Sequence, residues 1–177
     1  MIFGRQIAQI ATLLMLSGLL SACVSVSAYD QLNQRLSSEI AQGQVQITRL
    51  QGAIKVTVNS ELLFPSGGWQ MPPQAAQTIA KMAPVLAPMQ TAQITVTGYT
   101  DSTPIGPELR QQGVSSNQQL SLMRAQTVMQ YLISQGVNPS LLSARGLGEA
   151  DPVAPNDTPQ GRAQNRRVEL NLAGVGS

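Results

Sequence analysis

Hydrophobic and polar residues alternate with a period of two in several short stretches of the chain. This alternation is typical of β-strands that bury one face. Gln51-Gly52 lies between the first two stretches and predicts a hairpin turn there. The pattern predicts five strands, at Val45–Ile47, Ile54–Val58, Ile94–Gly98, Leu141–Leu147 and Val168–Leu172.

Two longer stretches repeat apolar residues at helical spacing. Pro72-Pro73 opens the first, where a missing N–H costs nothing, and Pro84 is expected to kink or split it. Ser116 and Gln119 form a capping box before the second, and Gly136 is expected to end it. The predicted buried positions are Ala75, Ile79, Met82 and Leu86 in the first helix, and Ala125, Val128, Met129 and Leu132 in the second.

The predicted elements follow the order β-β-α-β-α-β-β. This order favours an α/β fold (an α+β sandwich) in which the helices pack on one face of a mixed β-sheet. Leu62–Gly68 contains Pro65 and two glycines, so we expect a loop there. The folded domain is expected to span residues 45–177.

Residues 23–44 are expected to link this domain to the N-terminus. Tyr29, Leu32, Leu36 and Ile40 recur at helical spacing, and the pattern ends at Gly43. Two alternatives remain open for this segment: a spacer, or a short amphipathic helix packed on the edge of the domain.

Residues 1–22 are predicted to be a signal peptide. Arg5 supplies its positive charge, and the apolar run Ile7–Leu20 would rise about 21 Å as a helix, too short to span a bilayer. Leu20–Cys23 resembles the bacterial lipobox, which implies acylation of Cys23 and anchoring by lipid. Val24 stands where an aspartate would imply inner-membrane retention, so we expect the outer membrane, with the domain in the periplasm. The plainer alternative is a cleavage site beside an incidental cysteine.

Composition excludes several classes of function. Charged residues make up 11% of the 177 residues, the net charge is +2 and aromatic residues make up 3%, which disfavours a nucleic-acid partner. The chain has no histidine and one cysteine, so histidine-based catalysis and thiolate metal clusters are excluded. We therefore expect no metal and no cofactor, and a protein that is not an enzyme.

Three charged residues stand where solvation alone does not explain them. Arg124 projects to the same side of its helix as Asn117, at the edge of the buried stripe. Its plainer interpretation is an arginine whose stem covers the core while its head reaches water. Arg166 falls in line with the apolar face of the last strand and needs an anionic partner, either Asp101, Asp151 or a ligand carboxylate. Asp101 follows a strand directly, where ligands bind in open α/β sheets, although turn capping also explains it.

Several sequence blocks carry a resemblance to a known family. The chain resembles the OmpA C-terminal-like peptidoglycan-binding domain, represented by OmpA, Pal and MotB, over residues 53–172. The blocks that carry this resemblance are Gly98–Asp101, Asn117–Ala125, Gly146–Glu149, Asn156–Thr158 and Gly161–Glu169.

The resemblance implies a site for the peptidoglycan stem peptide, centred on diaminopimelate. By this resemblance, Asp101 pairs with the ammonium of diaminopimelate and Arg124 with its carboxylate. Thr100, Asn117 and Arg166 supply hydrogen bonds around them. One fixed negative and one fixed positive group are what a zwitterion requires.

The chain also departs from the compact members of this family. The loop Ser102–Ser116 is longer, and it is expected either to cover the site or to dock a partner. This longer loop, together with Leu63–Gly68 and Ser116-Asn117, is more similar to flagellar-stator B subunits than to the compact members. Those subunits have an ion-carrying transmembrane helix, whereas this chain has a lipobox. Trp69 precedes the first core helix as a packing residue or, alternatively, a partner contact.

Three functions follow as hypotheses. The first is an outer-membrane lipoprotein that tethers the membrane to peptidoglycan. The second is a structural component of an envelope-spanning machine, such as a type IV secretion core complex or a motor-associated ring, in which wall binding only localises the assembly. The third and weakest is a wall-cleaving enzyme that pairs Asp101 with Glu149 or Asp151.

Overall fold

The computed structural model describes residues 27–175 and contains one five-stranded sheet. The strand order is β1-β2-β5-β3-β4, in which β3 and β4 pair in parallel and the other neighbours pair antiparallel. Gly52 turns the β1–β2 hairpin with a positive φ of 71°, as the sequence predicts. The strands are β1 (Val45–Leu50), β2 (Ala53–Asn59), β3 (Gln93–Gly98), β4 (Leu142–Gly146) and β5 (Arg167–Ala173).

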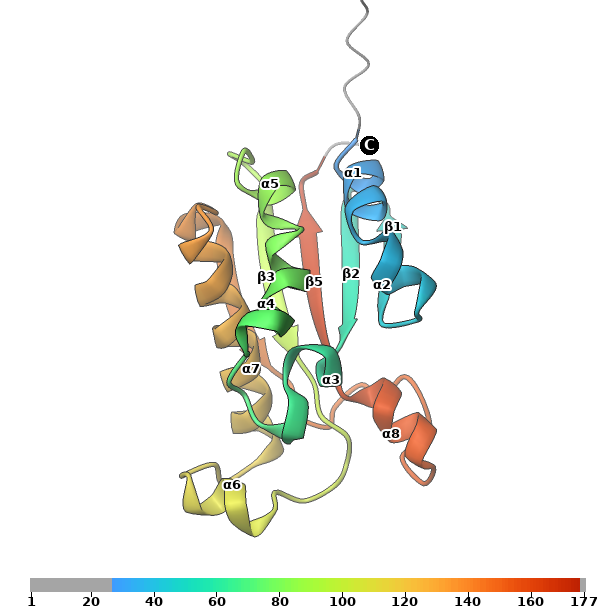
Figure 1. Ribbon diagram of the computed structural model, residues 1–177, viewed down its shortest axis with the longest axis vertical. Helices are drawn as coiled ribbons and strands as arrows, with labels where there is room; N and C mark the ends of the chain where they lie inside the picture. The colour runs from blue at the N-terminus through green and yellow to red at the C-terminus, as the bar shows by residue number, and fades with distance from the viewer. Residues whose placement is uncertain (1–26, 176–177) are drawn as a thin grey trace, which may run out of the picture.

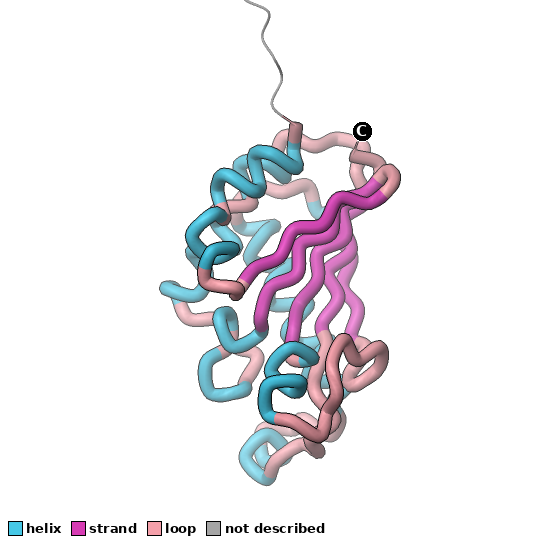
Figure 2. Tube along the Cα trace, turned by 90° about the vertical axis from the view of Figure 1, so that its right-hand side faces the viewer, coloured by secondary structure: helices cyan, strands magenta, loops and turns pink. Residues whose placement is uncertain are grey.

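Helices cover one face of this sheet and leave the other face open (Figures 1 and 2). The mixed sheet with one-sided helices confirms the predicted fold class. The α-helices are α1 (Ala28–Arg35), α2 (Ser37–Ala41), α3 (Ser60–Leu63), α4 (Pro73–Ala80), α5 (Ala83–Leu86), α6 (Pro107–Gln111), α7 (Asn117–Ser134) and α8 (Pro159–Asn165). Two 3-10 turns, η1 (Pro65–Gly67) and η2 (Pro139–Leu141), complete the elements of the described residues.

The core lies between the sheet and the helices. The largest fully buried side chains include Val56, Ile94, Leu170 and Leu172 from the strands and Ile79, Met82, Leu86 and Leu132 from the helices. The apolar positions predicted for the two long helices are buried in this core, apart from Met129, which is partly buried. The first of these helices is split, as expected, into α4 and α5, with Pro84 in the first turn of α5.

The segment before β1 is a packed helix and not a spacer. Leu32 and Leu36 are both 0% exposed and belong to the core. The helix breaks at Leu36 into α1 and α2. The predicted signal peptide and Cys23 lie outside the described residues. No helix within residues 27–175 combines the length and the apolar character needed to cross a bilayer.

Two local predictions need correction. The expected loop at Leu62–Gly68 instead contains the end of α3 and the turn η1, because Asn59 caps α3 and Pro65 opens η1. The predicted element order also omits α6, which lies within the expected loop Ser102–Ser116, and α8, which lies between β4 and β5. Thr158 caps α8 with its hydroxyl, and Pro159 is its first residue.

The long loop Ser102–Ser116 is built around its own small cluster. Ile105 and Val114 are buried with Leu120 of α7, and α6 lies between them in the chain. Trp69 packs against the same cluster. These apolar contacts hold the loop as a compact extension beyond the end of the sheet, where Figure 1 shows α6.

Candidate functional site

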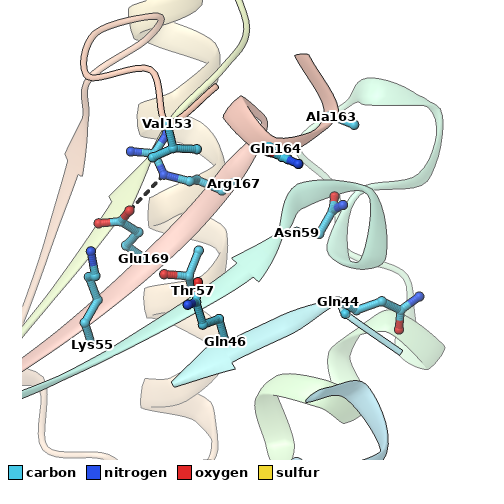
Figure 3. Close-up of a pocket in the computed structure, with 11 residues that line it drawn as sticks. Gln44, Gln46, Lys55, Thr57, Asn59, Val153, Ala163, Gln164, Arg167 and Glu169 are labelled. Carbon is cyan, nitrogen blue, oxygen red and sulfur yellow. Dashed lines mark hydrogen bonds and ion pairs between the residues drawn. The ribbon is translucent and has the colours of Figure 1, made fainter. Parts of the chain in front are cut away.

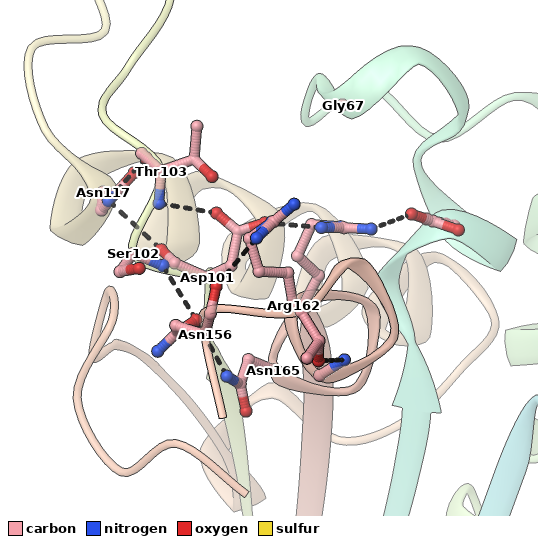
Figure 4. A network of polar contacts seen from close by, with 12 residues as sticks. Gly67, Asp101, Ser102, Thr103, Asn117, Asn156, Arg162 and Asn165 are labelled. Carbon is pink, nitrogen blue, oxygen red and sulfur yellow. Dashed lines mark hydrogen bonds and ion pairs between the residues drawn. The ribbon is translucent and has the colours of Figure 1, made fainter. Parts of the chain in front are cut away.

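Asp101 lies just beyond β3, at the end of the sheet marked by α3 and α6 in Figure 1. Its Oδ1 atom accepts a hydrogen bond of 2.9 Å from the Thr103 amide, and its Oδ2 atom pairs with Arg166 Nη1 at 2.5 Å. The carboxylate therefore caps a turn, as one of the two interpretations of Asp101 predicts, and it also forms an ion pair with Arg166. Figure 4 shows this network of contacts.

Arg166 links two carboxylates. Besides Asp101, its guanidinium pairs with Glu61 of α3. Burial lowers the pKa of Arg166, but the hydrogen bonds to Asp101 and Glu61 outweigh burial, and the pKa lies above its ordinary value. Of the partners that the sequence left open for Arg166, the structure selects Asp101.

The same contacts set the charge of Asp101. Burial raises the pKa of its carboxyl, but the hydrogen bonds from Arg166 and Thr103 outweigh burial, so the pKa lies below the ordinary value of 3.8. Asp101 is therefore negative at neutral pH. A fixed anion of this kind suits an ammonium ligand.

This depressed pKa predicts a pH dependence of stability. The contribution of Asp101 is complete above its unfolded pKa of about 3.9 and is lost as the pH falls through the lower folded pKa. We expect the melting temperature of Asp101→Asn to depend less on pH over that acidic range than the melting temperature of the parent. Circular dichroism melts from about pH 5 to about pH 2 measure this. Parallel curves for the two proteins would contradict the ion pair.

Arg124 is buried at the edge of the core, with 3% of its surface exposed. Its Nε donates a 2.9 Å hydrogen bond to the carbonyl of Gly68, a second guanidinium nitrogen donates to the carbonyl of Gly67, and the ring of Phe64 lies 5.6 Å away. The interpretation in which the head of Arg124 reaches water is therefore wrong. Burial, with a smaller effect of nearby Arg166, lowers the pKa of Arg124 to about 10, so it stays protonated at neutral pH.

A cavity of about 360 Å³ joins Arg124 to Arg166. Its walls also include Ser60, Glu61 and Phe64. We call it the arginine cavity. Ser60 is 2% exposed, and its hydroxyl has no hydrogen-bond partner; the hydroxyl of the buried Thr100 likewise has none.

The unpaired hydroxyl of Ser60 contrasts with that of Ser121. Ser121 Oγ donates to the Gln118 carbonyl and accepts a 2.8 Å bond from the Gly148 amide, and the Gly148 carbonyl in turn accepts from the Thr100 amide. We expect Ser121→Ala to lower the free energy of unfolding by about 1–3 kcal/mol, because a buried amide loses its partner, and Ser60→Ala to change it by less than about 0.5 kcal/mol. Urea unfolding of both variants checks this, and equal losses would contradict it.

Asn117, the first residue of α7, connects the start of this helix to the loop that carries Asp101. Its side-chain amide donates to the Thr103 carbonyl at 3.1 Å and to Glu149 Oε2 at 3.0 Å, and it lies 3.4 Å from the Asp101 carbonyl. Ser116 caps the helix through the Gln119 amide, as its sequence predicts. The structure thus gathers all five predicted site residues at one end of the sheet: Thr100, Asp101, Asn117, Arg124 and Arg166.

Sequence reasoning missed several supporting residues. Glu61 pairs with Arg166, and Asn156 Oδ1 accepts from the Ser102 amide at 3.2 Å. Asn165 is 1% exposed, and its side-chain oxygen accepts hydrogen bonds from the amides of residues 153 and 154. Its side-chain nitrogen donates to Asn156 Oδ1 at 2.9 Å (Figure 4). The Thr158-Pro159 pair signals the helix that carries Asn165, but no local pattern reveals the partner of Glu61.

A second hollow lies on the open face of the sheet, with a volume of about 370 Å³ (Figure 3). Two of its three charged lining residues pair with each other: Arg167 pairs with Glu169 at 2.8 Å and also donates to the Asp151 carbonyl. The third is Lys55 of β2. Arg167 also lies over the ring of Tyr99, 3.6 Å from its centre. These contacts brace β5 against the loop before α8. Among the described residues, no group of three or more potential metal ligands occurs.

Comparisons with known proteins extend these observations. Probable lipoprotein YiaD of Escherichia coli is 35% identical over 144 residues, which are 81% of this chain and 62% of that protein. Peptidoglycan-binding protein ArfA of Mycobacterium tuberculosis is 37% identical over 121 residues, which are 68% of this chain and 35% of that protein. The chain thus spans less than two thirds of the length of either relative.

Solved structures share the fold. A putative MotB-like protein from Desulfovibrio vulgaris matches with a TM-score of 0.74 and 29% identity, covering 85% of this chain and 91% of that one. The cell wall anchor of the T6SS from Pseudomonas aeruginosa matches with a TM-score of 0.73 and 30% identity, covering 82% and 98%. The model of the OmpA family matches residues 63–166, which include all five predicted site residues. The chain therefore belongs to the OmpA family.

Proposed function

We propose that this chain is a lipid-anchored outer-membrane protein that binds peptidoglycan non-covalently, through the diaminopimelate of the stem peptide. The observation that carries the proposal is the presence of two buried residues of opposite charge at one end of the sheet. Asp101 is 7% exposed and negative, and Arg124 is 3% exposed and positive. The names of two relatives, a peptidoglycan-binding protein and a cell wall anchor, support the choice of polymer.

The charge pattern fits the chemistry of that ligand. The free end of diaminopimelate carries one ammonium and one carboxylate, and each needs a fixed opposite charge to be held out of water. In the proposed complex, the ammonium binds Asp101, and Arg166 moves toward Glu61, with which it already pairs. The carboxylate binds the guanidinium of Arg124. No bond is made or broken, so the proposed role is binding and not catalysis.

The shape of the domain supports a tether. The start of α1 lies at the end of the sheet opposite α3 and α6, as Figure 1 shows. An anchor at Cys23 would therefore hold the domain with Asp101 turned away from the membrane. Modest affinity per site is enough, because many anchored copies face one polymer at high effective concentration.

A second candidate function is a structural part of an envelope machine. The compact loop Ser102–Ser116 favours it, because Ile105 and Val114 are buried to hold α6 out beyond the sheet. Wall binding would then localise the assembly. Co-purification of a complex that is lost when this loop is shortened would support this candidate.

Co-sedimentation tests the proposed function. The soluble form, with Cys23 replaced, is mixed with purified sacculi that contain diaminopimelate. We expect the protein to pellet with the sacculi and to stay in solution without them. Protein that stays in solution in both cases would overturn the proposal.

A further inference from the structure

A groove beside the arginine cavity has no role in the site described above. It has a volume of about 500 Å³ and lies between the segment that follows η1 and the helix α6. Trp69 and Gln70 line one side, and Glu108, Leu109 and Gln112 line the other. We call it the tryptophan groove.

The lining indicates a neutral polar ligand. Trp69 is only partly buried, because it packs on the Ile105 cluster and also faces the groove. An indole face offers apolar area, and two amides with one carboxylate offer both donors and acceptors for hydroxyl and acetamido groups. No arginine or lysine is among the described residues that line the groove, and Glu108 disfavours an anion. A volume of this size suits a small ligand or a short segment of a polymer.

The groove adjoins the arginine cavity. Pro65 lines both hollows, Gly67 lines the arginine cavity and Gly68 lines the groove. The carbonyls of these two glycines are the groups that hold the Arg124 guanidinium. Because the two hollows are neighbours, a polymer with one part bound at Arg124 can place a neighbouring unit in the groove that Trp69 lines.

We propose that the tryptophan groove binds an uncharged N-acetylated sugar of the glycan strand, with the sugar ring against Trp69. This inference rests on the proposed function, because it assigns the glycan to the groove and the stem peptide to Asp101 and Arg124. Gln70, Glu108 and Gln112 hydrogen-bond the hydroxyl and acetamido groups. The long loop then serves as one wall of a second subsite, since it contributes α6.

Fluorescence tests the inference directly, because Trp69 is the one tryptophan of the chain. The soluble form is titrated with a β-1,4-linked N-acetylglucosamine tetramer, which carries no peptide. We expect a saturable change in tryptophan emission. Its absence at millimolar sugar would overturn the inference without bearing on whether the parent protein pellets with sacculi.

Variants separate this groove from other sugar sites. The double variant Glu108→Gln with Gln112→Ala changes two exposed side chains. We expect it to lower the affinity for the tetramer by roughly fivefold or more, because hydrogen bonds to the sugar are lost. Gln164→Ala removes an exposed amide in the hollow on the open face of the sheet, and we expect it to leave the affinity for the tetramer unchanged. Unchanged affinity in the double variant would place the sugar elsewhere and overturn the inference.

A peptide-only ligand provides the last comparison. Trp69→Phe keeps an aromatic packing residue but shortens the platform, so we expect weaker sedimentation with sacculi. Binding of the free stem peptide, measured by calorimetry, is expected to be unchanged. An equal loss of both would assign Trp69 to support of the arginine cavity and overturn the sugar subsite.

Discussion

Replacing Arg124 with alanine is expected to abolish sedimentation with sacculi that contain diaminopimelate. The ligand carboxylate would enter a buried site that no longer holds its positive charge, and leaving one member of a buried ion pair alone costs about 3–5 kcal/mol. That cost corresponds to a loss of more than about a hundredfold in affinity. Asp101→Asn is expected to abolish sedimentation as well, because the ligand ammonium then loses its negative partner.

Controls separate this effect from loss of fold or of net charge. Arg124→Lys keeps a cation but loses the forked donors that bind Gly67 and Gly68, so we expect it to fold and to bind weakly. Arg145→Ala removes an exposed arginine of β4 and is expected to bind as the parent does. Circular dichroism verifies folding. Full sedimentation of folded Arg124→Ala would remove Arg124 from the proposed site.

Gly98→Ala is expected to lower the free energy of unfolding by about 3 kcal/mol. Gly98 ends β3, and an added Cβ there would lie closer than 3.0 Å to the backbone carbonyl of Ser121 in α7. Backbone atoms on both sides leave little room to adjust, so α7 must move away from the sheet. Chemical denaturation measures the loss.

Gly106→Ala is the matched control for this substitution. Its φ is −72°, which alanine adopts freely, and nothing lies within 4 Å of an added Cβ. We expect no loss of stability there. Because α7 carries Arg124, Gly98→Ala is also expected to weaken wall binding, whereas Gly106→Ala is not. Equal stability of the two variants would contradict the close approach of α7 to β3.

The sequence predicts the regular elements well, because each has a local physical signature. Alternation at Ile54–Val58 and Val168–Leu172 reflects burial of one face, and the Ser116 cap and Gly136 mark the two ends of α7. The helix α8 was missed although Thr158-Pro159 signals its start, since its seven residues carry little apolar periodicity.

The candidate site could be predicted only in part. Arg124 stands out because it lies at the edge of the buried stripe of its helix, and Asp101 stands out because it directly follows a strand. The family resemblance assigns them roles. The pairing of Arg166 with Glu61 joins residues 105 positions apart, which no local pattern encodes. The carbonyls of Gly67 and Gly68 that hold Arg124 are backbone groups, so side-chain patterns do not reveal them.

In the proposed complex, buried Asp101 and Arg124 together bind the free end of diaminopimelate. Calorimetry with two synthetic stem peptides tests it most directly: one contains diaminopimelate, and the other contains lysine, which has the ammonium but lacks the second carboxylate. We expect the soluble form to bind the diaminopimelate peptide at least about tenfold more tightly than the lysine peptide, the equivalent of about 1.4 kcal/mol. Equal affinity for the two peptides, or no heat with either, would show that Asp101 and Arg124 do not bind the free end of diaminopimelate.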